Sequence, residues 1–331
     1  MFRGFANVWT IATAQRLRRD APLAVTVAGE RVVFFRDREG VARALLDRCP
    51  HRGVQLSLGA VRDGCLVCPF HGWSFAGDGA VCEVPYNPDA RREQLGATVI
   101  PCEEHAGMLW IYTAPTVDGR APAPLELPGV LADTALRHVV DEVVWRTHWT
   151  RAMENMLDWP HLPFVHATTI GREMRAGLRR EARMDLTLTP TSSGVHSTIA
   201  IDGRAQPGGL DWVRPNMMVL HIDPPGRLFK NAVACVPVDE ATTRLVLIGS
   251  RGFLRAAVLD PLFVWANRRI AAQDRAVVES SWPAEVPPGR EERSVRTDRL
   301  TLMFRKHYHE HLRASAAEPP GRRALPVLDD D

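Results

Sequence analysis

The chain has no run of about 18 consecutive apolar residues, the length that a membrane-spanning helix needs. Its first residues also lack the apolar core of a secretory signal, because Arg3, Asn7 and Gln15 interrupt them. We therefore expect no association with a membrane, and we expect the protein in the cytoplasm.

Charge of one sign is not in excess either. The 41 Lys and Arg residues nearly balance the 39 Asp and Glu residues, the net charge is +2, and the arginines are scattered along the chain. This balance gives no electrostatic reason to expect nucleic acid as a partner. A G-x-G-x-x-G motif or other nucleotide loop is also missing, so NAD(P)H is expected to bind a separate reductase.

The 331 residues are enough for two domains. Residues 22–112 contain short strand-like runs separated by turn residues such as Asp63-Gly64. This pattern predicts a small all-β domain. A Pro-rich stretch follows from 114 to 130 and is typical of an extended linker.

The second half of the chain has a different pattern. A strand leading into a helix near Thr150 is followed by further strand-like runs and by a helical segment at 257–281. This order predicts an α+β domain with helices on one face of an antiparallel sheet. The predicted boundaries are 1–115 for the first domain, 116–140 for the linker, 141–315 for the second domain and 316–331 for a disordered tail.

Cysteine is scarce. In a cytosolic chain cysteines are more often metal ligands or small buried apolar residues than disulfide partners. Two of the six belong to paired clusters with histidines, and the other four are expected to be small buried apolar residues. These four are Cys65, Cys82, Cys102 and Cys235.

The other two cysteines belong to paired clusters, Cys49-Pro-His51 and Cys68-Pro-Phe-His71. Zinc would take all four side chains in one tetrahedron. A Rieske [2Fe–2S] centre instead binds one iron through two Cys and the other through two His. Each loop offers one Cys and one His, which suits two irons shared between facing loops, so the pattern favours the iron–sulfur cluster. Zinc remains the alternative.

A second candidate centre involves His161 and His166, which are five residues apart. On a regular helix they would point about 140° apart and could not share an ion. Pro160 and Pro163 remove helical N–H groups, and we expect Pro163 to break the helix between the pair, so that both rings turn to one centre. Asp158 is expected to accept a hydrogen bond from the His161 ring.

Two histidines need one carboxylate to complete the facial triad of a non-heme Fe(II) site. Asp274 lies in the middle of the expected helix, where its low helix propensity needs a reason. Asp260 directly precedes Pro261 and is better explained as a helix cap. The candidates are Asp260, Asp274, Glu279 and Asp298.

The chain resembles the Rieske non-heme iron oxygenases from about residue 5 to residue 312. The segments CPHRG and CPFHGWSF resemble the cluster loops of that family. The pattern N-x2-D-x2-H-x4-H resembles its presentation of two iron-binding histidines, and the segment around Asp274 resembles its third-ligand helix. The matching residues include Arg52, Gly53, Gly72, Trp73, Asn155, Asp158, His161 and His166.

The resemblance implies an N-terminal all-β Rieske domain and a C-terminal helix-grip (START-like) catalytic domain. It implies a [2Fe–2S] cluster, a mononuclear Fe(II), and O2 as co-substrate. It also implies a head-to-tail homotrimer in which Asp158 couples the cluster of one subunit to the iron of the next. The implied ligands are Cys49, His51, Cys68 and His71 for the cluster and His161, His166 and Asp274 for the single iron.

Asn155 and the short chain resemble the monooxygenase-like branch of the family. The expected reaction is therefore hydroxylation or oxidative demethylation of a small aromatic, heterocyclic or polycyclic substrate, with electrons from a ferredoxin and/or flavin reductase. Three alternatives remain: a cis-dihydroxylating dioxygenase, a non-catalytic Rieske electron carrier with a ligand-binding domain, and a zinc-stabilised binding module.

Overall fold

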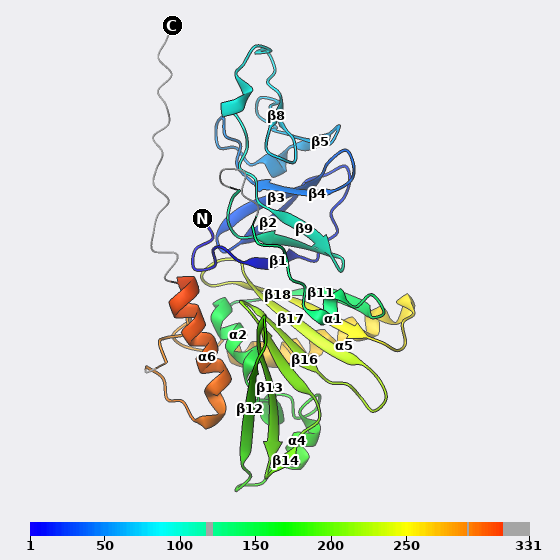
Figure 1. Ribbon diagram of the computed structural model, residues 1–331, viewed down its shortest axis with the longest axis vertical. Helices are drawn as coiled ribbons and strands as arrows, with labels where there is room; N and C mark the ends of the chain where they lie inside the picture. Colours follow the sequence, from blue (N-terminus) through cyan, green and yellow to red (C-terminus); the bar gives the residue numbers. More distant parts are fainter. Residues whose placement is uncertain (117–121, 290, 314–331) are drawn as a thin grey trace.

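The computed structural model describes residues 1–116, 122–289 and 291–313, which form two parts stacked along the long axis of the molecule (Figure 1). The N-terminal part consists of short strands and turns. The C-terminal part is a large antiparallel sheet with helices packed against it. This architecture confirms the predicted α+β fold class of an all-β domain followed by a sheet-and-helix domain.

Three antiparallel sheets build the N-terminal part within the described residues, in the orders β1-β10-β9, β2-β3-β4 and β5-β6-β7-β8. Val33 and Phe35 on β3 pack in a small core with Cys49 and Cys68, whereas the residues that alternate with them face the main core. Strand β3 therefore ties the two cysteine loops to the rest of the molecule. The strands are β1 (Trp9–Thr13), β2 (Leu23–Val27), β3 (Glu30–Arg36), β4 (Ala42–Leu46), β5 (Ala60–Arg62), β6 (Cys65–Val67), β7 (Ser74–Phe75), β8 (Val81–Glu83), β9 (Cys102–His105) and β10 (Met108–Tyr112).

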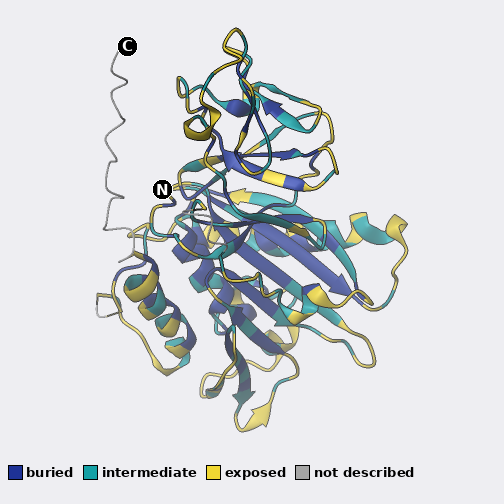
Figure 2. Ribbon diagram, turned by 45° about the horizontal axis from the view of Figure 1, so that its top comes forward, coloured by how far each residue is buried: buried dark blue, intermediate teal, exposed yellow. Residues whose placement is uncertain are grey.

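An eight-stranded antiparallel sheet forms the C-terminal part, in the order β11-β18-β17-β16-β15-β13-β12 with β14 paired to β13. Its central strands are buried over most of their length (Figure 2). The strands are β11 (Arg137–Trp145), β12 (Met184–Pro190), β13 (Gly194–Ile201), β14 (Arg204–Ala205), β15 (Gly209–Val213), β16 (Met217–His221), β17 (Phe229–Pro237) and β18 (Thr243–Arg251).

Helices cover one face of this sheet. Helix α2 packs on β16 and β17, α5 packs on β11 and β18, and α6 reaches β15 through Phe304, whose ring lies 5.9 Å from that of Trp212. Among the described helices, none combines the length and apolar character that a bilayer crossing requires. The helices are α1 (Gly129–Ala132), α2 (Trp149–Leu157), α3 (Leu162–Val165), α4 (Arg172–Ala176), α5 (Asp260–Val278) and α6 (Arg299–His307), with short 3₁₀ turns η1 (Leu56–Leu58), η2 (Arg92–Gln94), η3 (Ala257–Leu259) and η4 (Arg296–Asp298), and a π-helix η5 (Tyr308–Arg313).

One expectation about the cysteines is wrong. Cys65 and Cys82 are not separate small apolar residues but form a disulfide between β6 and β8, which flank the two-residue strand β7. Their closeness follows from strand pairing, which the spacing of 17 residues did not reveal. Cys102 and Cys235 remain free thiols, the first half-buried and the second fully buried, as expected.

The domain boundaries remain predictions. Strand β11 crosses the boundary proposed at residue 140 and pairs along its whole length with β18. The tail proposed at 316–331 lies outside the described residues.

Candidate metal centres and active site

The two cysteine–histidine loops share one hydrogen-bonding pattern. The N–H of Cys49 donates to the carbonyl of Val54, and the N–H of Gly53 donates back to the carbonyl of Cys49. In the second loop the N–H of Cys68 donates to Trp73, and that of Gly72 donates back to Cys68. Both glycines have a positive φ, 71° and 73°, which glycine adopts without strain. Two equivalent tight loops therefore present one Cys and one His each.

The four side chains of these loops converge. Cys49 and Cys68 are each 2% exposed, and burial together with the nearby Cys68 thiol raises the pKa of the Cys49 thiol. The rings of His51 and His71 have centroids 4.6 Å apart, and His51 Nδ1 is buried without a hydrogen-bond partner among the described residues. Paired thiols and imidazoles with an unpaired ring nitrogen fit the mixed ligand set of a Rieske [2Fe–2S] cluster.

Aromatic rings flank the two histidines of this group. Trp73 stacks on His51 at 4.5 Å and 6°, and Phe70 lies 3.9 Å from His71. His71 is exposed to solvent although both cysteines are buried. The histidine side of the group therefore faces outward.

Burial raises the pKa of the Cys49 thiol to about 11, so a bound cation is needed to hold the thiolate at neutral pH.

The second centre begins where α2 stops. Helix α2 ends at Leu157, and Asp158 is extended, with φ −90° and ψ 133°. The interruption comes before Pro160, whose ring disfavours helical geometry at the residue preceding it. The expectation that Pro163 breaks the helix between the two histidines is wrong. Pro163 lies in the first turn of the short helix α3, where a missing N–H has no helical partner to lose.

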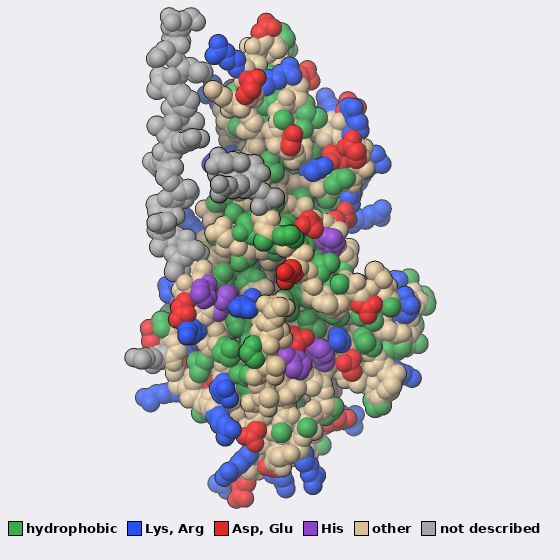
Figure 3. Space-filling view, viewed as in Figure 1, with side chains coloured by type: hydrophobic (Ala, Val, Ile, Leu, Met, Phe, Trp, Pro, Cys, Tyr) green, Lys and Arg blue, Asp and Glu red, His purple; other side chains and the backbone are tan. Residues whose placement is uncertain are grey.

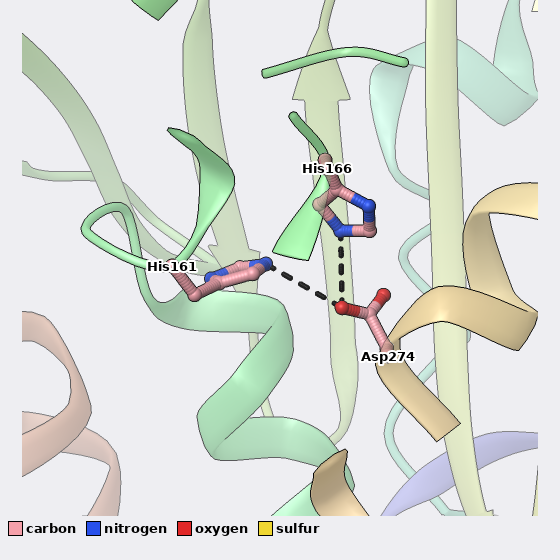
Figure 4. A group of neighbouring side chains, drawn as sticks. All are labelled: His161, His166 and Asp274. Carbon is pink, nitrogen blue, oxygen red and sulfur yellow. Dashed lines mark ion pairs between the residues drawn. The ribbon is translucent and has the colours of Figure 1, made fainter. Parts of the chain in front are cut away.

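Helix α3 and helix α5 bring His161, His166 and Asp274 together (Figure 4). His161 directly precedes α3 and His166 directly follows it, and their ring centroids are 5.2 Å apart. Asp274 Oδ1 lies 3.0 Å from His166 Nε2 and 3.6 Å from His161 Nε2. The three ligand atoms thus point to one common space, as the predicted triad requires.

Hydrogen bonds on the far side of each ring orient both histidines. His161 Nδ1 lies 3.1 Å from Asp158 Oδ2, which also accepts the backbone N–H of His161 at 2.9 Å. His166 Nδ1 lies 3.0 Å from Gln273 Oε1. Since a carboxylate or amide oxygen accepts, both Nδ1 atoms carry the proton and both Nε2 lone pairs face inward. Metal-binding histidines are commonly held in this way.

The space between the three groups suits a cation. Asp274 is 4% exposed, and its Oδ1 accepts no hydrogen bond although two imidazole nitrogens lie beside it. Burial lowers the pKa of His166, but the Asp274 carboxylate, 3.0 Å from its Nε2, outweighs this and holds the pKa above its ordinary value. A proton on His166 or a metal ion can thus neutralise the cluster. The donor set of two imidazoles and one carboxylate matches non-heme Fe(II).

The other candidate carboxylates are occupied elsewhere. The expectation that Asp260 caps α5 is wrong. Its carboxylate forms ion pairs with Arg137 and Arg251, which hold its pKa at about 2. Glu279 accepts the backbone N–H of Arg146 at 2.7 Å. Asp298 accepts the backbone N–H of Val295 at 2.7 Å, at the start of α6. None of the three approaches the histidine pair.

A cavity opens beside the three groups. Its wall is mainly aliphatic, and none of the described residues that line it is Lys or Arg. Asn155 on α2 and Asp158 directly after α2 also line the cavity. The aliphatic lining residues are Met156, Leu162, Ile170, Leu210, Met218, Leu220, Ala232, Val233, Leu247, Ile248, Ile270 and Ala271.

Two further carboxamides interrupt the apolar wall, and no sequence pattern pointed to them. Asn231 Oδ1 is buried without a hydrogen-bond partner among the described residues. Asn267 is 8% exposed. Both approach Gly249, because a Cβ there would meet Asn267 Nδ2 at 3.1 Å and Asn231 Oδ1 at 3.7 Å. The cavity therefore offers a donor and an acceptor close together.

The two centres lie far apart within one chain. The sheet β5-β6-β7-β8, whose strands flank the second cysteine loop, lies at one end of the long axis, and α2 and α5 belong to the other part (Figure 1).

Side chains of both charge signs are scattered over the face seen in Figure 3, as expected from the balanced composition.

Comparison with known proteins gives two domain matches. Residues 7–104 match the family described as Rieske [2Fe-2S] domain, and residues 145–314 match the vanillate O-demethylase oxygenase C-terminal domain. Together the two matches cover both parts of the fold, and the second covers His161, His166 and Asp274.

Individual relatives agree with these matches. Chlorophyllide a oxygenase of Chlamydomonas reinhardtii is 27% identical over 360 residues, which cover 96% of this chain but 50% of that protein, so the chain spans half of its length. Methylxanthine N1-demethylase NdmA of Pseudomonas putida is 29% identical over 94% of this chain and 89% of its own. The solved structure of Pseudomonas putida CBB5 NdmA has a TM-score of 0.75 at 26% identity, covering 92% of this chain and 89% of that one.

Proposed function

Because the chain belongs to the Rieske oxygenases that carry a vanillate O-demethylase-type C-terminal domain, we propose that it is an oxygenase component that hydroxylates or oxidatively demethylates a small organic molecule. The observation that carries the proposal is the convergence of His161, His166 and Asp274 on one space beside a largely apolar cavity. A non-catalytic electron carrier would not need this convergence.

We assign the cluster to Cys49, His51, Cys68 and His71 and the single iron to His161, His166 and Asp274. When bound, the cluster supplies electrons one at a time and Fe(II) supplies the activation of O2. The protein's own residues orient these ligands. Asp158 and Gln273 hold the two imidazoles through their Nδ1 protons, and the aliphatic wall keeps water away from the substrate.

The cavity supports a neutral, mostly apolar substrate. A carboxylate substrate would need a cationic partner, and the described lining residues provide no Lys or Arg. Asn231 and Asn267 instead offer neutral hydrogen bonds to a carbonyl, an amide or a ring nitrogen. An aromatic or heterocyclic compound with one or two such groups fits this description, and N- or O-methyl derivatives are the first to test.

We infer that electrons pass between subunits. The two centres lie far apart within one chain, His71 is exposed, and the Asp158 side chain is 28% exposed beside His161. A head-to-tail homotrimer would place His71 of the partner subunit next to Asp158, since a heterologous contact can close into a ring. The electrons would come from a ferredoxin and/or flavin reductase in the cytoplasm.

The proposal is tested by substrate-dependent oxygen uptake. Purified protein loaded with iron would be mixed with a surrogate reductase and NADH, and N-methyl, O-methyl and unsubstituted aromatic compounds would be screened. Uptake coupled to formaldehyde release indicates demethylation, and a dihydrodiol product would indicate the dioxygenase alternative. A coloured, reducible protein that consumes no oxygen with any compound, and that loses no iron in His161→Ala, would support the carrier instead.

A further inference from the structure

A second group of imidazole and carboxylate side chains lies on the large sheet. His196 is on β13, Asp211 on β15 and His221 on β16. His196 Nδ1 lies 2.5 Å from Asp211 Oδ1, and His221 Nε2 lies 2.7 Å from Asp211 Oδ2. The two rings are 5.7 Å apart and nearly perpendicular, at 77°. One carboxylate therefore joins two imidazoles from neighbouring strands.

Strand register explains why the sequence did not reveal this group. His196 pairs directly with Asp211. His221 pairs with Gly209, which lies two residues before Asp211 on the same strand. A Cβ at position 209 would lie 2.6 Å from His196 Cε1 and 3.1 Å from its Nε2. Gly209 thus leaves the space that the His196 ring occupies above the sheet.

The group lies on the opposite face of the sheet from the active site. Successive residues of a strand face opposite sides. Leu210 and Leu220, the neighbours of Asp211 and His221, line the cavity. Asp211 and His221 therefore face outward, away from the cavity, and the group is separate from the iron centre.

We propose that His196, Asp211 and His221 bind a divalent transition-metal ion of the Zn²⁺ type on the outer face of the sheet. Two imidazoles and one carboxylate are a common ligand set for such ions, and a water molecule can take the fourth position. The three side chains are 36%, 29% and 20% exposed, so an ion can reach them from solvent. This site does not depend on the proposed oxygenase function.

Only a small rearrangement separates the present geometry from coordination. Zinc bonds of about 2.1 Å in a tetrahedron place ligand atoms about 3.4 Å apart. The two nitrogen–oxygen distances must therefore open by less than about 1 Å, and each imidazole proton must move to the far ring nitrogen. The antiparallel strands hold the three backbones in register, and the exposed rings can exchange protons with water.

One neighbouring charge opposes the ion. Lys230 on β17 pairs directly with His221, so its side chain leaves the same face of the sheet. Its ammonium group weakens the attraction for a dication while it stays near. Replacing it by a neutral residue of similar length should therefore tighten binding, which a group stabilised by hydrogen bonds alone would not show.

Equilibrium dialysis of the iron-loaded full chain against micromolar Zn²⁺, followed by elemental analysis, tests the site. We expect one additional zinc per wild-type chain, and binding at least about tenfold weaker in the His196→Ala, His221→Ala double variant. His138→Ala is the matched control, because His138 lies on the same sheet bonded to Ser250 and should change nothing. His161→Ala should keep the additional zinc, which separates this site from the inner one.

Further variants guard against loss of folding. Asp211→Asn retains the shape and a hydrogen-bonding group, and it should also weaken zinc binding, whereas Lys230→Gln should strengthen it. Zn²⁺ should raise the midpoint of thermal unfolding in wild type but not in Asp211→Asn. Equal zinc contents in wild type, the double variant and Asp211→Asn would overturn the proposal and leave a group stabilised by hydrogen bonds only.

Discussion

Gln273 Oε1 lies 3.0 Å from His166 Nδ1 and also accepts the hydroxyl of Thr169 at 2.8 Å. Gln273 thus orients His166 from α5, the same helix that carries the proposed ligand Asp274. Asp158 does the same for His161 from the end of α2. Each imidazole is therefore fixed by an oxygen acceptor on the side away from the centre.

Gln273→Leu should weaken iron binding at the single-iron site. The substitution removes the acceptor that fixes the His166 tautomer, and losses of this kind cost about 10- to 100-fold in metal affinity. Iron content after dialysis against a chelator measures the effect. Gln273→Glu keeps an acceptor oxygen and should retain iron, while equal iron contents in the Leu variant and wild type would show that this hydrogen bond is unimportant.

Asp158→Ala, reconstituted with excess Fe(II) so that both metal centres are occupied despite the lost acceptor for His161, should stop turnover. Asp158 lines the cavity beside His161, and we infer that electrons enter the iron site past it. Oxygen uptake and the visible spectrum of the reduced cluster provide the measurements. Asp158→Asn is the control, since it keeps an acceptor for the backbone N–H of His161. Normal uptake in the Ala variant would remove Asp158 from the electron route.

Asn231→Leu should lower kcat/KM by about tenfold, the size expected for one lost neutral hydrogen bond. The buried Asn231 Oδ1 has no partner among the described residues and faces the cavity region. Steady-state oxygen uptake with an active substrate checks this, and the iron content should stay unchanged. Leu220→Val, an apolar change in the same wall, should have a much smaller effect. Equal losses in both variants would mean that Asn231 contributes only to packing.

Glu292 should stabilise the fold at neutral pH but not in acid. It accepts hydrogen bonds from Arg151, at 2.7 Å, and from Arg305, which together hold its pKa at about 2, below the ordinary value of 4.5. A lowered folded-state pKa contributes stability above the unfolded pKa, and this contribution is lost as the pH falls toward 2.

Glu292→Gln should therefore lower the midpoint of urea-induced unfolding at pH 7, with a gap from wild type that narrows toward pH 3. Tryptophan fluorescence can follow both proteins. Glu291→Gln, at the adjacent position, is the control and should leave the midpoint unchanged. A gap that stays constant between pH 7 and pH 3 would contradict the ionic explanation.

Local patterns in the sequence predicted much of the architecture. Alternating apolar residues predicted β2, β3 and most strands of the large sheet, and the helical composition after Pro261 predicted α5. Strand β1 precedes the predicted strand-like runs, which begin at residue 22, and was missed; it pairs with β10. Strand β9, with the sequence CEEH, is polar and lacks strand propensity.

The candidate site was predictable where chemistry and spacing coincide. Few other functions need two such Cys–His clusters, Cys49-Pro-His51 and Cys68-Pro-Phe-His71, and Asp274 is an unusual residue inside a helix. The acceptor Gln273 and the cavity residues Asn231 and Asn267 were missed because a single amide side chain belongs to no metal-ligand or catalytic spacing pattern. Their roles depend on which side chains the tertiary fold turns inward.

The most direct test is an anomalous-difference map from crystals of the iron-loaded protein, measured at the iron absorption edge. Our account predicts one isolated iron peak between His161 Nε2, His166 Nε2 and Asp274 Oδ1, and a separate pair of peaks between the Cys49–His51 and Cys68–His71 loops. A map without density between the three residues, in a protein whose cluster is fully occupied, would contradict the proposed oxygenase centre.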